Sequence, residues 1–73
     1  HDSISFLAAE TRFAKGQCEE AIKKFDDYLS KFPTGYFLLQ AHFYRSECLF
    51  KLKNYKESVK GYEYVADAGM NIF

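Results

Sequence analysis

An internal repeat constrains the fold of this chain more than any other feature of its sequence. When the chain is aligned with itself at an offset of 37 residues, five positions are identical: Phe6 with Phe43, Glu10 with Glu47, Phe13 with Phe50, Glu20 with Glu57 and Lys23 with Lys60. Conservative pairs, such as Phe25 with Tyr62, lie between them. A unit of this length cannot bury its apolar face alone, so two stacked copies must share one core.

Each copy of the repeat is predicted to contain two helices. Helix-capping and helix-breaking residues place the four helices at Asp2 or Ser3 to Lys15, Cys18 to Lys31, Tyr36 to Leu52 and Tyr55 to Ala68. Gly16 and Gly69 terminate helices, Pro33 stops the second, and Thr34 is a possible N-cap of the third. Residues of strand-forming type are scarce and do not alternate. The predicted fold class is all-α, with two stacked antiparallel helical hairpins.

The stretch AHFYRSECLF, residues 41–50, carries its apolar side chains in adjacent pairs. Phe43 with Tyr44, and Leu49 with Phe50, cover a wider arc than the single stripe of a surface helix. In a stacked array, one helix of each hairpin contacts both its partner and the neighbouring hairpin. The wide arc therefore indicates a solenoid segment.

Three stretches together resemble tetratricopeptide repeats. Residues 16–33, GQCEEAIKKFDDYLSKFP, have the turn glycine, small residue, aromatic residue and closing proline at Gly16, Ala21, Phe25 and Pro33. Residues 53–65, KNYKESVKGYEYV, match the same pattern with Tyr55, Ser58, Tyr62 and Val65. Residues 41–50 look like the first helix of a repeat, with Ser46 at the close helix crossing. The resemblance implies one domain over residues 1–73, with repeats at 2–35 and 36–70.

The sequence departs from the family pattern at several positions. The offset of 37 residues exceeds the usual repeat length of about 34, so the connection between the two hairpins is longer than usual. In this respect the chain is similar to repeats of bacterial cell-envelope proteins. That similarity favours the cell envelope slightly as the location, and a cytoplasmic location remains open. Arg45 stands at a position where the family prefers leucine, so it must snorkel or find a carboxylate. Tyr28 replaces a small residue, which could splay the first hairpin. Residues 71–73 read as the start of a further helix or a tail, as expected of a piece of a longer array.

In the family, the first helix of each hairpin lines a concave groove that binds segments of partner proteins. The resemblance therefore implies a groove made of Phe6, Glu10, Phe13, Ala14, Phe43, Glu47, Phe50 and Lys51. The spacing of four and then three residues independently places each set on one helical stripe. An aromatic stripe can equally be core, and the two glutamates could be solvated surface or ion-pair partners of Arg12 and Arg45. These alternatives stay open at the level of sequence.

Composition removes several classes of function. Ten basic and ten acidic side chains cancel, which argues against a nucleic-acid binder, because such a protein needs a concentrated cationic surface. No stretch approaches the length of about 20 apolar residues that crosses a membrane. No combination of catalytic residues, glycine-rich phosphate loop or clustered metal ligands is present. We therefore expect no enzyme activity, cofactor or metal.

The remaining hypotheses are a module that binds a protein or peptide partner, and a structural spacer or self-association segment of a longer array. As an isolated piece the chain is expected to be a monomer or a weak dimer. The two cysteines, Cys18 at a turn and Cys48 in mid-helix, are expected to be reduced, with side chains that do not face each other. A single disulfide between them is the alternative that the sequence leaves open.

Overall fold

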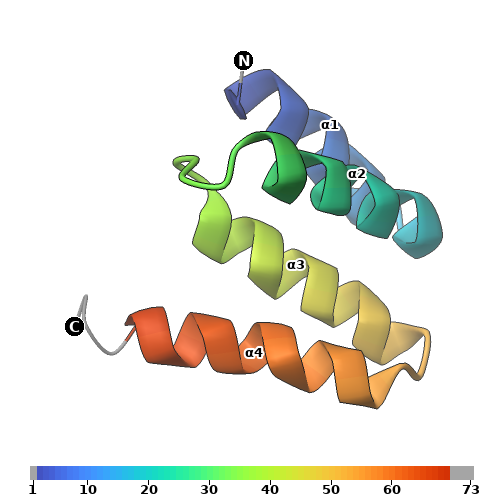
Figure 1. The fold of residues 1–73 in the computed structure, drawn as a ribbon. Helices are drawn as coiled ribbons and strands as arrows, with labels where there is room; N and C mark the ends of the chain where they lie inside the picture. The colour runs from blue at the N-terminus through green and yellow to red at the C-terminus, as the bar shows by residue number, and fades with distance from the viewer. Residues whose placement is uncertain (1, 70–73) are drawn as a thin grey trace.

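A computed structural model describes residues 2–69 as four helices in two hairpins (Figure 1). The helices are α1 (Asp2–Ala14), α2 (Cys18–Lys31), α3 (Leu38–Lys51) and α4 (Tyr55–Gly69). Each helix packs against the next one in the chain, and α1 also reaches α3. Residues 2–69 contain no strand, so the predicted all-α fold of stacked hairpins is confirmed. The predicted repeat end at residue 70 and the continuation over 71–73 lie outside the described residues.

The two hairpin turns have the same backbone geometry, offset by 37 residues. In the first turn the amides of Gly16 and Gln17 donate to the carbonyls of Phe13 and Arg12, at 3.0 and 2.9 Å. In the second, the amides of Lys53 and Asn54 donate to the carbonyls of Phe50 and Leu49, at 2.9 and 2.8 Å. Gly16 has φ 77° and Lys53 has φ 66°. Both turns thus end a helix with a left-handed residue, and the second turn does so without a glycine.

Helix α3 begins later than the sequence predicts, at Leu38 instead of Tyr36. Its N-cap is Phe37, with φ −106° and ψ 28° and no side-chain cap, so the cap predicted at Thr34 is wrong. The Phe37 ring stacks on Phe6 of α1, with ring centroids 4.5 Å apart and 10° between the planes. This aromatic contact across the two hairpins holds Phe37 outside the helix.

Tyr28 fills the space beneath the connection between α2 and α3. Its side chain is fully buried, and its hydroxyl accepts a hydrogen bond from the Phe37 amide at 3.0 Å. The same hydroxyl lies 3.5 Å from Asp2 Oδ2, which accepts a bond from the Tyr36 amide at 2.9 Å. Burial is the main cause that raises the pKa of the Tyr28 phenol. The large residue at this position therefore anchors the lengthened connection.

The core is shared by the first hairpin and the inner face of α3. The buried cluster consists of Phe6, Ala9, Cys18, Ala21, Phe25, Tyr28, Ala41 and Cys48. Ala21 and Ser58, the small residues of the two repeat patterns, are buried, with 0% and 1% of their surfaces exposed. Phe25 and Tyr62 are equivalent in the repeat, and the prediction of equivalent core environments that follows from it is wrong. Tyr44 of α3 lies against the buried Phe25 ring, whereas Tyr62 in α4 is only half-buried, since no described helix packs beyond it.

Helices α3 and α4 cross most closely at Ser46 and Gly61. A Cβ atom added to Gly61 would lie 1.8 Å from Ser46 Oγ and 3.1 Å from the carbonyl oxygen of His42. The Ser46 hydroxyl is buried without a hydrogen-bond partner among the described residues. His42 stacks on Tyr64 of α4, with ring centroids 3.9 Å apart. A side chain at position 61 would therefore require the Ser46 hydroxyl to move and the two helices to shift slightly apart.

Candidate functional site

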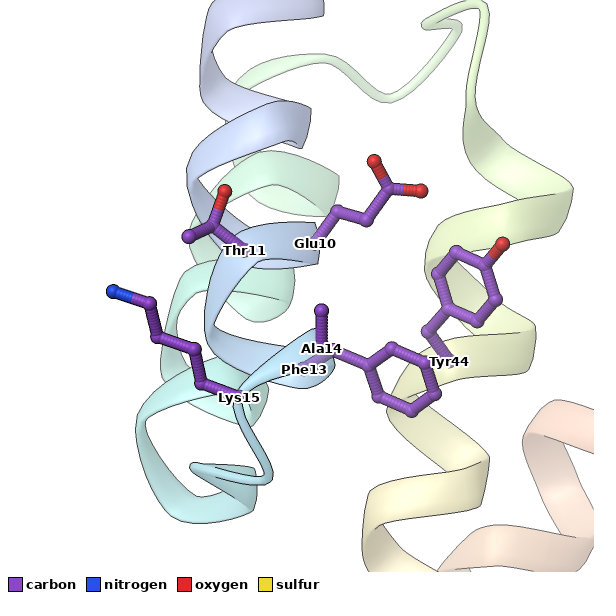
Figure 2. Close-up of a pocket in the computed structure, with 6 residues that line it drawn as sticks. All are labelled: Glu10, Thr11, Phe13, Ala14, Lys15 and Tyr44. Atoms are coloured by element: carbon purple, nitrogen blue, oxygen red, sulfur yellow. The ribbon is translucent and has the colours of Figure 1, made fainter.

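The open face of the first hairpin carries a hollow between α1 and α3 (Figure 2). Its volume is about 420 Å³, and it is lined by Glu10, Thr11, Phe13, Ala14, Lys15 and Tyr44. The Phe13 ring stacks on Tyr44 with centroids 4.6 Å apart and 19° between the planes. Figure 2 shows the Glu10 carboxylate above this pair, projecting from α1 toward α3. The hollow thus has an aromatic floor and an acidic side.

A second hollow, of about 250 Å³, continues along α3 toward α4. It is lined by Leu39, Gln40, Phe43, Tyr44 and Val65. Tyr44 belongs to both hollows and lies against the Phe43 ring at a centroid distance of 6.0 Å. We call the two hollows together the Tyr44 groove. Three of its residues, Phe13, Tyr44 and Phe43, form a continuous row of rings from α1 to α3.

The two glutamates of the repeated stripe have different surroundings. Within residues 2–69 the Glu10 carboxylate has no hydrogen-bond or ion-pair partner. Glu47 accepts a hydrogen bond from the Tyr62 hydroxyl. Burial, followed by this bond to Glu47, raises the pKa of Tyr62 to about 12. Glu10 is therefore available to a ligand, whereas Glu47 is engaged within the second hairpin.

Neither arginine pairs with these glutamates. Arg12 donates to Gln17 Oε1 at 3.0 Å and lies 3.9 Å from Glu20. Arg45 donates through Nε to Asp26 Oδ1 at 2.6 Å, which links α3 to α2. Of the two alternatives predicted for Arg45, snorkelling or a carboxylate partner, the structure shows the carboxylate partner. The alternative that pairs Arg12 and Arg45 with Glu10 and Glu47 is wrong.

The structure places the predicted groove residues in three environments. Phe6 is 4% exposed and lies in the core, beneath Tyr44. Glu10, Phe13 and Ala14 line the first hollow, and Phe43 lines the second. Phe50 is 54% exposed and contacts Tyr55 at 5.1 Å, outside both hollows, while Lys51 is exposed at the end of α3.

The stripe prediction did not include Tyr44, the residue that joins the two hollows. It sits beside Phe43 in the adjacent pair that makes the apolar arc of α3 unusually wide. That width was the available signal, because a residue at the edge of the arc faces the neighbouring hairpin.

Comparison with known proteins supports the family resemblance for the first hairpin. The tetratricopeptide repeat family model matches residues 4–35, which are most of α1, all of α2 and part of the following connection. Together with the four stacked helices, this match is consistent with an all-α helical repeat segment of the tetratricopeptide type. Such repeats generally serve as protein-interaction modules. No curated protein and no solved structure matches the chain.

Other site types find no support in the described part of the chain. Residues 2–69 contain no group of three or more metal-binding side chains that could hold an ion. Over the same range, every helix is too short or too polar to cross a bilayer.

Proposed function

We propose that this chain is a non-enzymatic module that binds an extended or helical segment of a partner protein in the Tyr44 groove. The observation that carries the proposal is the continuous row of Phe13, Tyr44 and Phe43 at the floor of two adjoining hollows. Phe43 is 40% exposed, so a bound segment would remove apolar surface from water. The match of the first hairpin to an interaction repeat supports the same reading.

The chemistry of the groove favours a partner segment that carries a cation among apolar residues. The Glu10 carboxylate lies beside the ring row and has no partner among the residues that the structure describes. Ring faces also attract a lysine or arginine head group. An ion pair formed next to these rings is partly shielded from water. A charge-assisted hydrogen bond is stronger in such a shielded position than in open solvent. Lys15, directly after α1, also lines this hollow, but its ammonium group points away from Phe13 and Tyr44 (Figure 2), so Glu10 is the charged group that faces the ring row.

The proposal is tested with peptides selected from a random displayed library against the native chain. The selected peptides should contain aromatic or aliphatic residues with one lysine or arginine. Glu10→Lys should weaken their binding about tenfold or more, as measured by calorimetry. Glu19→Lys is the matched control, because Glu19 is exposed on α2 and lines neither hollow of the groove. Equal losses in the two variants, or chemical shift changes confined to α2 and α4, would refute groove binding.

A structural role in stacking is the second candidate, and one observation favours it. Helix α4 exposes Tyr55 and Val59, one turn apart on the same side of the helix, by 50% and 49%, so the last described helix has an uncovered apolar surface. In a longer array, such a surface would pack on a neighbouring hairpin, and in isolation it would support weak self-association. Sedimentation equilibrium tests the self-association of the isolated chain. An apparent mass that rises with concentration supports the stacking role, and a mass fixed at one chain rules out self-association.

A further inference from the structure

Cys18 and Cys48 lie together where the first hairpin meets the second. Cys18 is the first residue of α2 and Cys48 lies in α3. Both belong to the same buried cluster, with 8% and 0% of their surfaces exposed. Burial and a hydrogen bond with the Cys18 thiol raise the pKa of the Cys48 thiol to about 12. The expectation that these side chains do not face each other was therefore wrong.

The two thiols differ in access from solvent. Cys18 lines a surface hollow of about 240 Å³ with Gly16, Gln17, Glu19, Glu20 and Leu52. The Leu52 amide donates to the Cys48 carbonyl at 3.0 Å, so this hollow opens one helical turn away from Cys48. A small reagent can thus approach Cys18, while Cys48 lies behind it in the core.

We propose that Cys18 and Cys48 form a reversible intramolecular disulfide that fastens α2 to α3. Both cysteines are free thiols in the structure, and both belong to one buried cluster where α2 packs on α3, so folding holds the two thiols near each other, as a disulfide requires. Among residues 2–69, the bond would reinforce a junction that is otherwise held by aromatic packing and by the ion pair of Arg45 with Asp26. This inference does not depend on the proposed groove function.

The reaction requires an oxidant, for which we name a small diffusible disulfide of the glutathione type. The Cys18 thiolate attacks one sulfur of that disulfide, forms a mixed disulfide and releases the first small thiol. Cys48 then loses its proton and attacks the Cys18 sulfur, which forms the protein disulfide and releases the second small thiol. Two electrons pass from the protein thiols to the reagent, and their two protons end on the released thiols. The raised pKa of Cys48 makes the second step the slower one at neutral pH.

The test measures the equilibrium between reduced and oxidised chain in buffers of reduced and oxidised glutathione. Samples of folded chain and of chain in concentrated urea are quenched with acid, alkylated in denaturant and analysed by mass spectrometry. The folded chain should form the bond with an equilibrium constant about tenfold or more above that in urea, because folding holds the thiols together. The oxidised chain should also melt at a higher temperature than the reduced chain.

Cys18→Ala and Cys48→Ala serve as controls, since neither can form the internal bond. An equilibrium constant in the folded chain equal to or below that in urea would overturn the proposal. So would a main product with glutathione still attached to Cys18, or disulfide-linked dimers in place of the internal bond.

Discussion

Gly61→Ala is expected to destabilise the chain, although alanine is the better helix former. Glycine in a helix interior costs about 1 kcal/mol relative to alanine, so propensity alone predicts a gain from the substitution. The new Cβ, however, would lie 1.8 Å from Ser46 Oγ, 3.2 Å from Ser46 Cβ and 3.1 Å from the His42 carbonyl oxygen. Overpacking of this kind costs about 1–3 kcal/mol. Because the His42 carbonyl is backbone and cannot rotate away, we place the cost at the upper end, for a net loss of about 2 kcal/mol.

Ser46→Ala tests whether the loss of stability caused by Gly61→Ala comes from the clash with the Ser46 hydroxyl. Alone, it removes a buried hydroxyl that has no partner among residues 2–69, which should stabilise the chain by about 1 kcal/mol. In the double variant the 1.8 Å contact with Ser46 Oγ is absent, so the loss caused by Gly61→Ala should shrink by about 1 kcal/mol or more. The double-mutant cycle should therefore show strong coupling between the two positions.

Thermal denaturation with a circular dichroism readout measures all four chains of the cycle. For a domain of this size, a loss of about 2 kcal/mol corresponds to a fall in Tm of roughly 8–16 °C. Gly69→Ala is the matched control, because the same helix ends at this residue and an added Cβ meets nothing within 4 Å. A higher Tm for Gly61→Ala, or additive effects of the two substitutions, would refute the close crossing.

Three further predictions follow from single side chains. Tyr28→Phe should cost about 1–3 kcal/mol in urea denaturation, because the Phe37 amide loses its acceptor in a buried position. Lys53→Gly should raise stability by about 1 kcal/mol, since it removes the penalty of a side chain at φ 66°; an unchanged Tm would contradict this. Burial, aided by Arg45, lowers the pKa of His42 below 6.5. The unfolded chain therefore binds that proton first, and stability should fall below about pH 6.5. The native chain should therefore lose part of its advantage in Tm over the His42→Gln variant between about pH 7.5 and about pH 5. A difference in Tm that stays constant over this range would contradict the lowered pKa of His42.

The sequence was sufficient to predict the helices and their pairing. Each predicted helix end lies within two residues of the observed one, since Gly16 and Pro33 act through local backbone preferences. The largest deviation, at the start of α3, comes from a tertiary contact: Phe37 stacks on Phe6, which no local rule contains.

The candidate site was harder to predict from the sequence, because identical residues of the two repeats have different neighbours in the folded chain. Phe6 and Phe43 are equivalent in the repeat, yet they are 4% and 40% exposed. Phe6 is covered by Phe37 and Tyr44, whereas Phe43 has no following hairpin within residues 2–69. The contact of Cys18 with a cysteine 30 positions later likewise depends on how α2 and α3 are aligned against each other, which the pattern of each helix leaves open.

The anchoring of the α2–α3 connection also affects how the chain opens locally. The amides of Tyr36 and Phe37 lie outside any helix, yet they donate to Asp2 in the first turn of α1 and to the buried Tyr28. Their hydrogen exchange with solvent should consequently be slow for a loop, and the rate at Tyr36 should follow the fraying of α1 more than the motion of the connection itself. The exchange rates of these two loop amides would therefore show, in a single experiment, whether the first turn of α1 is packed against the α2–α3 connection.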